Sequence, residues 1–274
     1  MHRSKTNIAV SYFLIILFGL AMATPFVWMI LSSFKTEVEL MQTPPSFLPR
    51  HYKLTNYLTI MQSIPFLSFY LHTIIITVIR TLAQLAFCSM AAFAFAKMHF
   101  KGQNIVFIVL LTVLMVPVQM ILVPDYIIMR TLGLVDSLWG VALPGMFSAF
   151  GMFLLRQFYM SLPNEFLDAG RIDGCSYFGV FRRLYLPLSK SALISLVIFT
   201  VMYSWNDYLW PLIISSSDNS RVLSVGLALL QGQNRVYYNE LMAGATMATI
   251  PVILIFVFFQ RYFVQGIALS GIKG

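Results

Sequence analysis

Charged residues are scarce in this chain. Asp, Glu, Lys and Arg make up 10% of its 274 residues, against about 25% in an ordinary soluble domain. Hydrophobic residues make up 59%, and the mean hydropathy is +0.80. The apolar runs recur along the whole chain, and no polar block between them is long enough to fold by itself. A soluble domain could not bury that much apolar surface, so the composition predicts one membrane domain over residues 1–274.

The chain also has only two cysteines and lacks the nucleotide-binding motif of P-loop ATPases. Cys88 and Cys175 show neither the spacing of metal ligands nor a disulfide framework, so we expect no metal and no other cofactor in this chain. The motif Gly-x-x-x-x-Gly-Lys-Ser/Thr, which cradles phosphates in P-loop ATPases, does not occur. We therefore expect a chain that is not an enzyme, and any ATP that drives it must be hydrolysed by another chain.

The sequence contains six long apolar runs. A helix needs about 20 apolar residues to cross a bilayer, and continuous runs without period-two alternation predict helices rather than a barrel. The first run passes a possible signal-cleavage site, Ala21-Met22-Ala23, but continues to Leu31, which favours an uncleaved span. The expected fold class is all-α, a membrane protein with six transmembrane helices at about 8–31, 69–96, 104–123, 138–157, 191–213 and 241–263.

Lys and Arg residues predict the orientation of these spans. Eleven of them fall in the segments on one side of the membrane and six on the other. By the positive-inside rule, both termini and the loop 157–190 are cytoplasmic, and three longer connections, 32–68, 124–137 and 214–240, lie outside. The net charge of +8 is spread over short loops, which indicates contact with membrane lipid and argues against nucleic acid.

The cytoplasmic loop 157–190 has a helical pattern of its own. Pro163 favours a helix start and Gly174 a left-handed helix end, and a second amphipathic helix should finish near Pro187. The first helix has an apolar row and a charged row, formed by Leu162, Phe166, Ala169 and Ile172, and by Glu165, Asp168 and Arg171. Helices this short are marginal in water. Either the lipid surface or a protein partner is therefore expected to cover them.

The spacing of this loop favours the protein partner. It reads Asp168-Ala169-Gly170, three residues, Gly174, nine residues, Leu184, one residue, Leu186-Pro187, and it resembles the EAA loop of ABC importer permeases. The family pattern has Glu, Ala and Ile at 168, 170 and 184, and Gly170 should weaken the helix by up to about 1 kcal/mol relative to Ala. Further phrases resemble the carbohydrate-uptake branch, similar to the second membrane subunit of the maltose transporter: 91–97, 133–137, 171–174, 205–207 and 260–274.

This resemblance implies the type I ABC importer permease fold in the bacterial cytoplasmic membrane. It implies import of a sugar or oligosaccharide by alternating access, with a phosphorylated polyol left open. The implied partners are a second permease subunit, two ATPase subunits that bind the ATP, and an extracytoplasmic solute-binding protein. The residues implied in ATPase coupling are Glu165, Asp168, Ala169, Gly170, Arg171, Asp173, Gly174, Leu186 and Pro187.

Polar residues inside or at the ends of the apolar runs are candidates for the substrate pathway, because burial in a membrane is costly for them. They are Arg80, Gln84, Gln119, Asn206 and Asp207. Arg80 contacts either substrate or an inward partner such as a backbone carbonyl. The segment 205–208 is either part of an aromatic belt at a helix end or a sugar site that combines polar groups with aromatic faces.

An ion-gradient-driven secondary transporter of a polar solute is the alternative function. Such transporters usually hold carboxylates at bilayer depth, and of the acidic residues only Asp207 comes near that depth, at the end of a run. A membrane scaffold without transport is a third possibility, but it would not need the spacing of the cytoplasmic loop.

Overall fold

The computed structural model describes residues 5–231 and 236–271, and for residues 5–9 and 261–271 it describes the backbone alone. Arg3, Arg235 and Lys273, which contribute to the predicted orientation, lie outside the described residues. Within these ranges the chain is helical, with an isolated bridge between Gln231 and Val236 and no β-strand. The all-α fold class is confirmed.

Four helical stretches of the described residues are long and apolar enough to cross a membrane: Val10–Ser33, Phe66–Lys97, Leu138–Ser161 and Tyr238–Gln260. Two bent helix pairs, Gln103–Met115 with Val118–Thr131 and Tyr177–Leu188 with Lys190–Trp205, raise the number to six if each pair is one span. The chain divides into two compact units, residues 1–66 with 226–250 and residues 67–225 with 251–274. Three helices contribute to both units: α4 (Phe66–Lys97), α14 (Leu223–Leu229) and α15 (Tyr238–Gly271).

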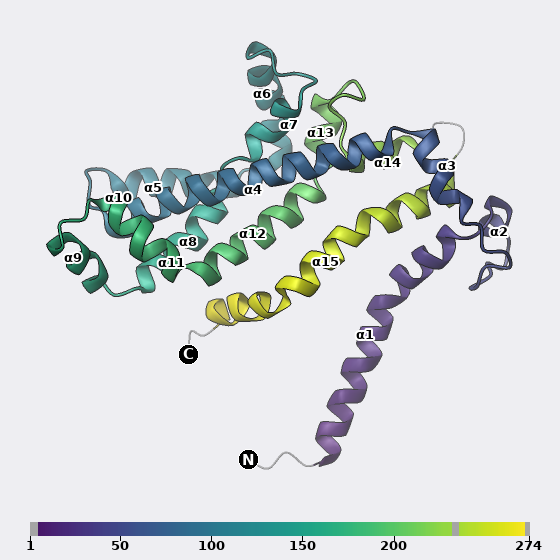
Figure 1. Cartoon of the computed structure of the whole chain (residues 1–274), viewed down its shortest axis with the longest axis horizontal. Helices are drawn as coiled ribbons and strands as arrows, with labels where there is room; N and C mark the ends of the chain where they lie inside the picture. Colours follow the sequence, from purple (N-terminus) through teal and green to yellow (C-terminus); the bar gives the residue numbers. More distant parts are fainter. Residues whose placement is uncertain (1–4, 232–235, 272–274) are drawn as a thin grey trace. The chain divides into compact units, whose positions relative to one another are not determined.

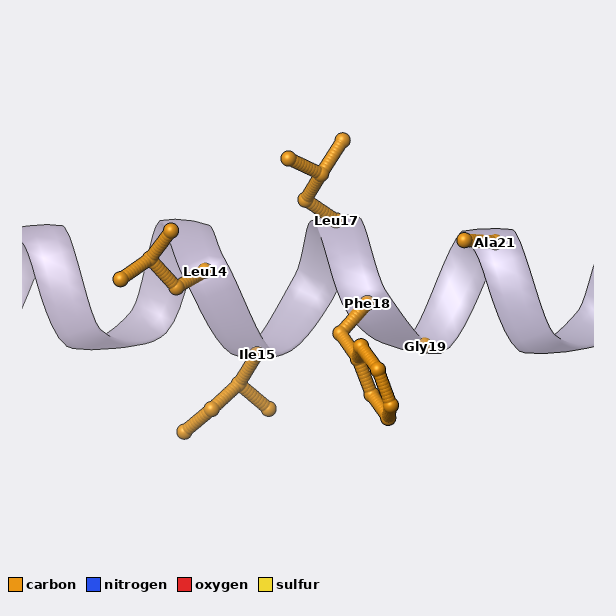
Figure 2. A pocket seen from close by; sticks show the side chains of 6 residues that line it. All are labelled: Leu14, Ile15, Leu17, Phe18, Gly19 and Ala21. Atoms are coloured by element: carbon orange, nitrogen blue, oxygen red, sulfur yellow. The ribbon is translucent and has the colours of Figure 1, made fainter.

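The first unit begins with α1 (Lys5–Ser33), a helix that is apolar on every side. Figure 2 shows Leu17 and Phe18 projecting to different sides of it. The surface depression of about 790 Å³ beside residues 14–21 is lined by Leu, Ile, Phe, Gly and Ala, which offer a polar solute no side-chain hydrogen bond. A helix that is hydrophobic all round suits a lipid environment.

Asn56 joins the helices of the first unit. The last carbonyls of α1 have no partner within the helix, and Asn56 at the start of α3 (Thr55–Ser63) donates from Nδ2 to Ser33 O at 2.8 Å and Lys35 O at 2.9 Å. Its Oδ1 accepts from Asn239 Nδ2, at the start of α15, at 3.1 Å. Asn56 is fully buried, so these bonds are needed to offset its desolvation. The short α2 (Glu37–Met41), which lies between α1 and α3 in the sequence, begins with a capping box formed by Thr36 and Glu39.

The second unit is built around α4, α8 (Ala149–Ser161) and α12 (Lys190–Trp205), with α5 (Gln103–Thr112) beside them (Figure 1). Phe93, Leu155, Tyr159, Tyr185 and Leu196 belong to one buried cluster that joins these helices to the loop after α8. A second cluster joins α4 to α6 (Val118–Thr131), α7 (Leu138–Ala142) and α13 (Leu209–Ile214).

Three of the expected helices are interrupted, and the run 138–157 is one of them, since α7 (Leu138–Ala142) and α8 are separate helices. The run 104–123 turns by 106° between η1 (Val113–Met115) and α6, because Pro117 lacks an amide hydrogen and disfavours α-helical backbone at Val116. Helix α6 then continues to Thr131, so residues 124–131, expected in an outer loop, are helical. The run 191–213 likewise ends as a helix at Trp205, and α13 is separate.

Candidate functional site

A cavity of about 430 Å³ lies in the second unit, between residues of α4, α6, α8 and α12 and the segments that adjoin them. Its aromatic lining residues are Phe147, Phe150, Phe199, Tyr203 and Trp210, and its polar ones are Arg80, Gln84, Asp125, Ser148, Thr200 and Asp207. Apolar and aromatic walls with a few convergent polar groups are typical of small-molecule sites, which usually measure about 300–1,000 Å³.

Arg80 is the most highly connected residue of this cavity. Its Nη1 lies 2.8 Å from Asp207 Oδ2, and Nη2 donates to Val141 O at 2.6 Å. Nε donates to Ala142 O at 3.3 Å. The structure therefore shows the inward pairing for Arg80, with a carboxylate and with backbone carbonyls together.

The helix break after α7 provides these carbonyls. A proline at position 144 has no amide hydrogen to return to Gly140 O, and Trp210 Nε1 donates to that oxygen instead, at 3.1 Å. In the turn η2 (Leu143–Gly145), Met146 N bonds Leu143 O, which leaves Ala142 O for Arg80. A Cβ on Gly145 would lie 2.5 Å from Arg80 Nε, so a larger residue here would require the Arg80 side chain to move.

Gln84, one turn along α4 from Arg80, is hydrogen-bonded at both ends of its side-chain amide. Its Nε2 donates to Gly145 O at 2.8 Å, and its Oε1 accepts from Thr200 Oγ1 at 2.7 Å. Of the five residues expected in a substrate pathway, Arg80, Gln84 and Asp207 thus meet at one cavity. Their role toward a substrate stays a prediction.

The other two expected pathway residues do not line the cavity. Gln119 is exposed on α6, beside the lining residue Val118. Asn206 is exposed, and its Nδ2 donates to Met202 O at 2.8 Å. Of the neighbouring aromatic residues, Trp205 is buried and packs edge-on against Tyr70, with ring centroids 5.5 Å apart.

Sequence reasoning missed Asp125 and Tyr203. Val118, Ile121, Leu122 and Asp125 all line the cavity, and their spacing of i, i+3, i+4 and i+7 is that of one helix face. A prediction that a new helix begins after Pro117 would have placed Asp125 on the same helix face as Val118. Among residues 5–231 and 236–271, no three His, Cys, Asp or Glu side chains come together as metal ligands would.

The loop after α8 contains α9 (Glu165–Ile172), α10 (Tyr177–Val180), the π-helix η3 (Phe181–Tyr185) and α11 (Leu186–Leu188). Gly174 takes φ +79° just after α9, the left-handed conformation expected of it. Gly170 is buried, and a Cβ there would lie 2.8 Å from Val180 Cγ2. The glycine at this position, where the family pattern has alanine, therefore allows α9 to pack closely on α10.

Lys97 anchors this loop to the end of α4, where α9 to α11 are grouped (Figure 1). Its Nζ donates to Leu162 O at 2.7 Å and to Asn164 Oδ1 at 2.6 Å. The Tyr185 ring packs at 5.0 Å from that of Phe93 on α4 and at 5.8 Å from that of Tyr159 on α8. The loop is thus continuous with the helical core of its unit.

The outer face of α9 and α10 carries exposed apolar side chains. Ile172 is 85% exposed, Phe178 62% and Phe166 40%, whereas Leu167 and Gly170 face the core. Glu165 and Asp168 are exposed on the same loop, as are Ala169, Arg171, Asp173, Gly174 and Pro187, while Leu186 is half-buried. Apolar side chains beside acidic ones, on a loop fixed to the core, suit a protein partner better than water.

A second polar site links the connection before α7 with the connection after α13. Asp136 has φ +57°, and its Oδ1 accepts from the hydroxyl of Ser220 and from the amides of Ser217 and Ser216, each amide at 2.9 Å. These hydrogen bonds hold the pKa of the Asp136 carboxyl well below its ordinary value, because they favour the ionised form.

Apolar helices, a cavity among them lined by aromatic and a few polar side chains, and a loop packed against the helical core define a membrane transport chain. The sequence pattern of the binding-protein-dependent transport system inner membrane components matches residues 84–269. The chain belongs to this family, and its resemblance to ABC importer permeases is confirmed.

Several known proteins are similar to this chain over most of their length. The arabinooligosaccharides transport system permease protein AraQ of Halalkalibacterium halodurans is 34% identical over 91% of each chain. The sn-glycerol-3-phosphate transport system permease protein UgpE of Salmonella choleraesuis is 35% identical over 82% of this chain and 83% of its own. A chain of a bacterial ABC transporter involved in the import of the acidic polysaccharide alginate has the same fold, with a TM-score of 0.83, 23% identity, and coverage of 96% and 99%.

Proposed function

We propose that this chain is the permease subunit of an ATP-driven importer that moves a sugar or oligosaccharide across the bacterial cytoplasmic membrane by alternating access. The observation that carries the proposal is the loop of α9 to α11, fixed to the core and presenting acidic and apolar side chains outward. Its spacing in the sequence and the family of the chain support the same conclusion. The sugar is supported by the relatives and by the aromatic and polar lining of the cavity.

Two continuous helices connect this loop with the cavity. Helix α4 carries Lys97 at the loop and Arg80 at the cavity, 17 residues apart, which is about 25 Å along an α-helix. Helix α12 begins just after the loop and carries Thr200 and Tyr203 on the cavity wall. A displacement of α9 would therefore shift both cavity walls, and an ATPase that binds the loop differently in its two states would bias the cavity between inward and outward access.

The proposed assembly contains this chain, a second permease subunit, two ATPase subunits that bind ATP, and an extracytoplasmic solute-binding protein. In it the termini and the loop 157–190 face the cytoplasm, as the distribution of Lys and Arg predicts. The family description supports the binding protein and the inner membrane.

Charge reversal at Asp168 tests the coupling. We expect Asp168→Lys to abolish co-purification of the ATPase subunit and ATP-dependent uptake, while Asp168→Glu, the acid of the family pattern, retains both. Asp168 is exposed, so neither variant should lower the yield of folded chain. Unchanged uptake and ATPase attachment in Asp168→Lys would contradict the proposal.

Uptake without ATP would support the alternative instead. In proteoliposomes, the proposed importer requires ATP inside and is insensitive to ionophores that collapse proton and sodium gradients. A secondary transporter shows the reverse pattern.

A further inference from the structure

The cavity contains one basic side chain, Arg80, and this side chain is already bound to other groups of the protein. All residues that line the cavity belong to the described part of the chain, and none of the others is Lys, Arg or His. Arg80 is paired with Asp207 and with two backbone carbonyls. A phosphate or carboxylate entering the cavity would have to take Arg80 from Asp207, which would leave a buried carboxylate unpaired. Such a loss is strongly unfavourable.

Two other polar groups of the wall are available. Asp125 is half-buried on α6 and lines the cavity, and it has no hydrogen bond or ion pair with the described residues. The hydroxyl of Tyr203 on α12 likewise has no hydrogen bond within the described chain. An ionised carboxylate accepts hydrogen bonds from hydroxyl groups and repels anions. If Asp125 is protonated, the wall still offers no cation.

We propose that this cavity takes an uncharged polyhydroxy solute and rejects phosphorylated polyols and uronates. Asp125 accepts hydrogen bonds from the solute's hydroxyl groups, and Tyr203 supplies an aromatic face and a hydroxyl. This inference rests on the proposed function. The names of the relatives include both a neutral oligosaccharide and a phosphate ester as cargo, and the inference selects the uncharged class.

Uptake by the complete importer tests the cargo class. The assembly, with its ATPase subunits and binding protein, is placed in proteoliposomes containing ATP and given radiolabelled probes. The uncharged probes are arabinotriose, maltotriose and raffinose, and the anionic ones are sn-glycerol 3-phosphate and digalacturonate. We expect at least one uncharged probe to enter at least tenfold faster than either anion.

Comparable uptake of an anion, or no uptake of any uncharged probe, would overturn the inference. Its failure can be distinguished from failure of the proposed function. Uptake of an uncharged probe that continues without ATP refutes the ATP-driven importer but agrees with the cargo class. ATP-dependent uptake of an anion agrees with the ATP-driven importer but refutes the cargo class.

Variants at Asp125 test the contact itself. We expect Asp125→Leu to raise the KM for the transported probe about tenfold, the size of one lost hydrogen bond to a charged group. Asp125→Asn retains an acceptor and should stay within about threefold of the original KM. Thr131→Leu, an exposed change on the same helix outside the cavity, is the matched control and should leave KM unchanged.

The yield of assembled importer separates binding from folding. We expect that yield to be unchanged in Asp125→Leu while KM rises, and we expect the control Thr131→Leu, outside the cavity, to leave the yield and the basal ATPase activity unchanged. An unchanged KM, or an equal effect of Thr131→Leu, would show that Asp125 does not contact the cargo.

Discussion

Removing one partner of the ion pair between Arg80 and Asp207 should strongly destabilise the cavity region. Both side chains are nearly sealed from solvent, with 3% and 10% exposed. In Asp207→Leu, the Arg80 guanidinium would keep its two carbonyl partners and lose its counter-charge. In Arg80→Met, a buried carboxylate and the carbonyls of Val141 and Ala142 would lose their partner together.

The expected magnitude follows from this geometry. Removing one partner of a buried ion pair costs about 3–5 kcal/mol, whereas replacing both by apolar residues is often neutral. For a chain of this size, 1 kcal/mol corresponds to about 2–4 °C in Tm. Each single variant should therefore lower Tm by roughly 10 °C. The double variant Arg80→Met/Asp207→Leu should lose clearly less than the two single losses added together.

Thermal unfolding of the purified chain in detergent, followed by intrinsic fluorescence, measures these effects. Asp218→Leu, which breaks the exposed pair with Arg221, is the matched control and should shift Tm by no more than about 4 °C, since exposed pairs contribute about 0–1 kcal/mol. Strict additivity of the two cavity variants would refute the reasoning, because it would mean that the two charges do not depend on each other.

Three further predictions concern glycines and one carboxylate. Gly244→Leu should lower Tm, since overpacking costs about 1–3 kcal/mol and a Cβ there would lie 2.4 Å from Ile60 Cδ1, whereas Gly19→Leu, in open space, should not lower Tm. The folded state lowers the pKa of Asp136 below its ordinary value of 3.8. Asp136 should therefore stabilise the fold above pH 3.8, and this stabilisation should be lost as the pH falls below that value. In Asp136→Asn, the fall of Tm between pH 5 and about pH 3 should be flatter. Gly170→Leu should reduce ATP-dependent uptake by forcing α9 away from Val180; normal uptake with normal ATPase attachment would contradict this role.

The six apolar runs were sufficient to predict the fold class, because bilayer thickness and backbone hydrogen bonding leave few other solutions for such a sequence. The helix breaks were harder to find. Pro117 and Pro144 lie within stretches of continuously high hydropathy, so an average over a span conceals them. The error at Pro117 assigned residues 124–131 to a loop, and Asp125 was therefore not considered among the cavity residues.

The partners of Arg80 could be anticipated only as a class. A cation inside a membrane must be paired, which leaves a carboxylate or carbonyls as candidates. Which carbonyls become free depends on the proline break after α7, and which carboxylate comes close depends on the end of α12, 127 residues from Arg80 in the sequence. Neither follows from local sequence.

Gly170 shows how one residue can oppose local preference and serve the packing between helices. In isolation it weakens α9 by up to about 1 kcal/mol relative to alanine, and it departs from the family pattern at that position. In the folded loop its missing Cβ is where Val180 Cγ2 approaches, so the loss in helix propensity accompanies a closer contact with α10. Because α10 and η3 connect α9 with the ring cluster of Tyr185 and Phe93, we expect that contact to carry a displacement of α9 to α4 in the proposed coupling mechanism.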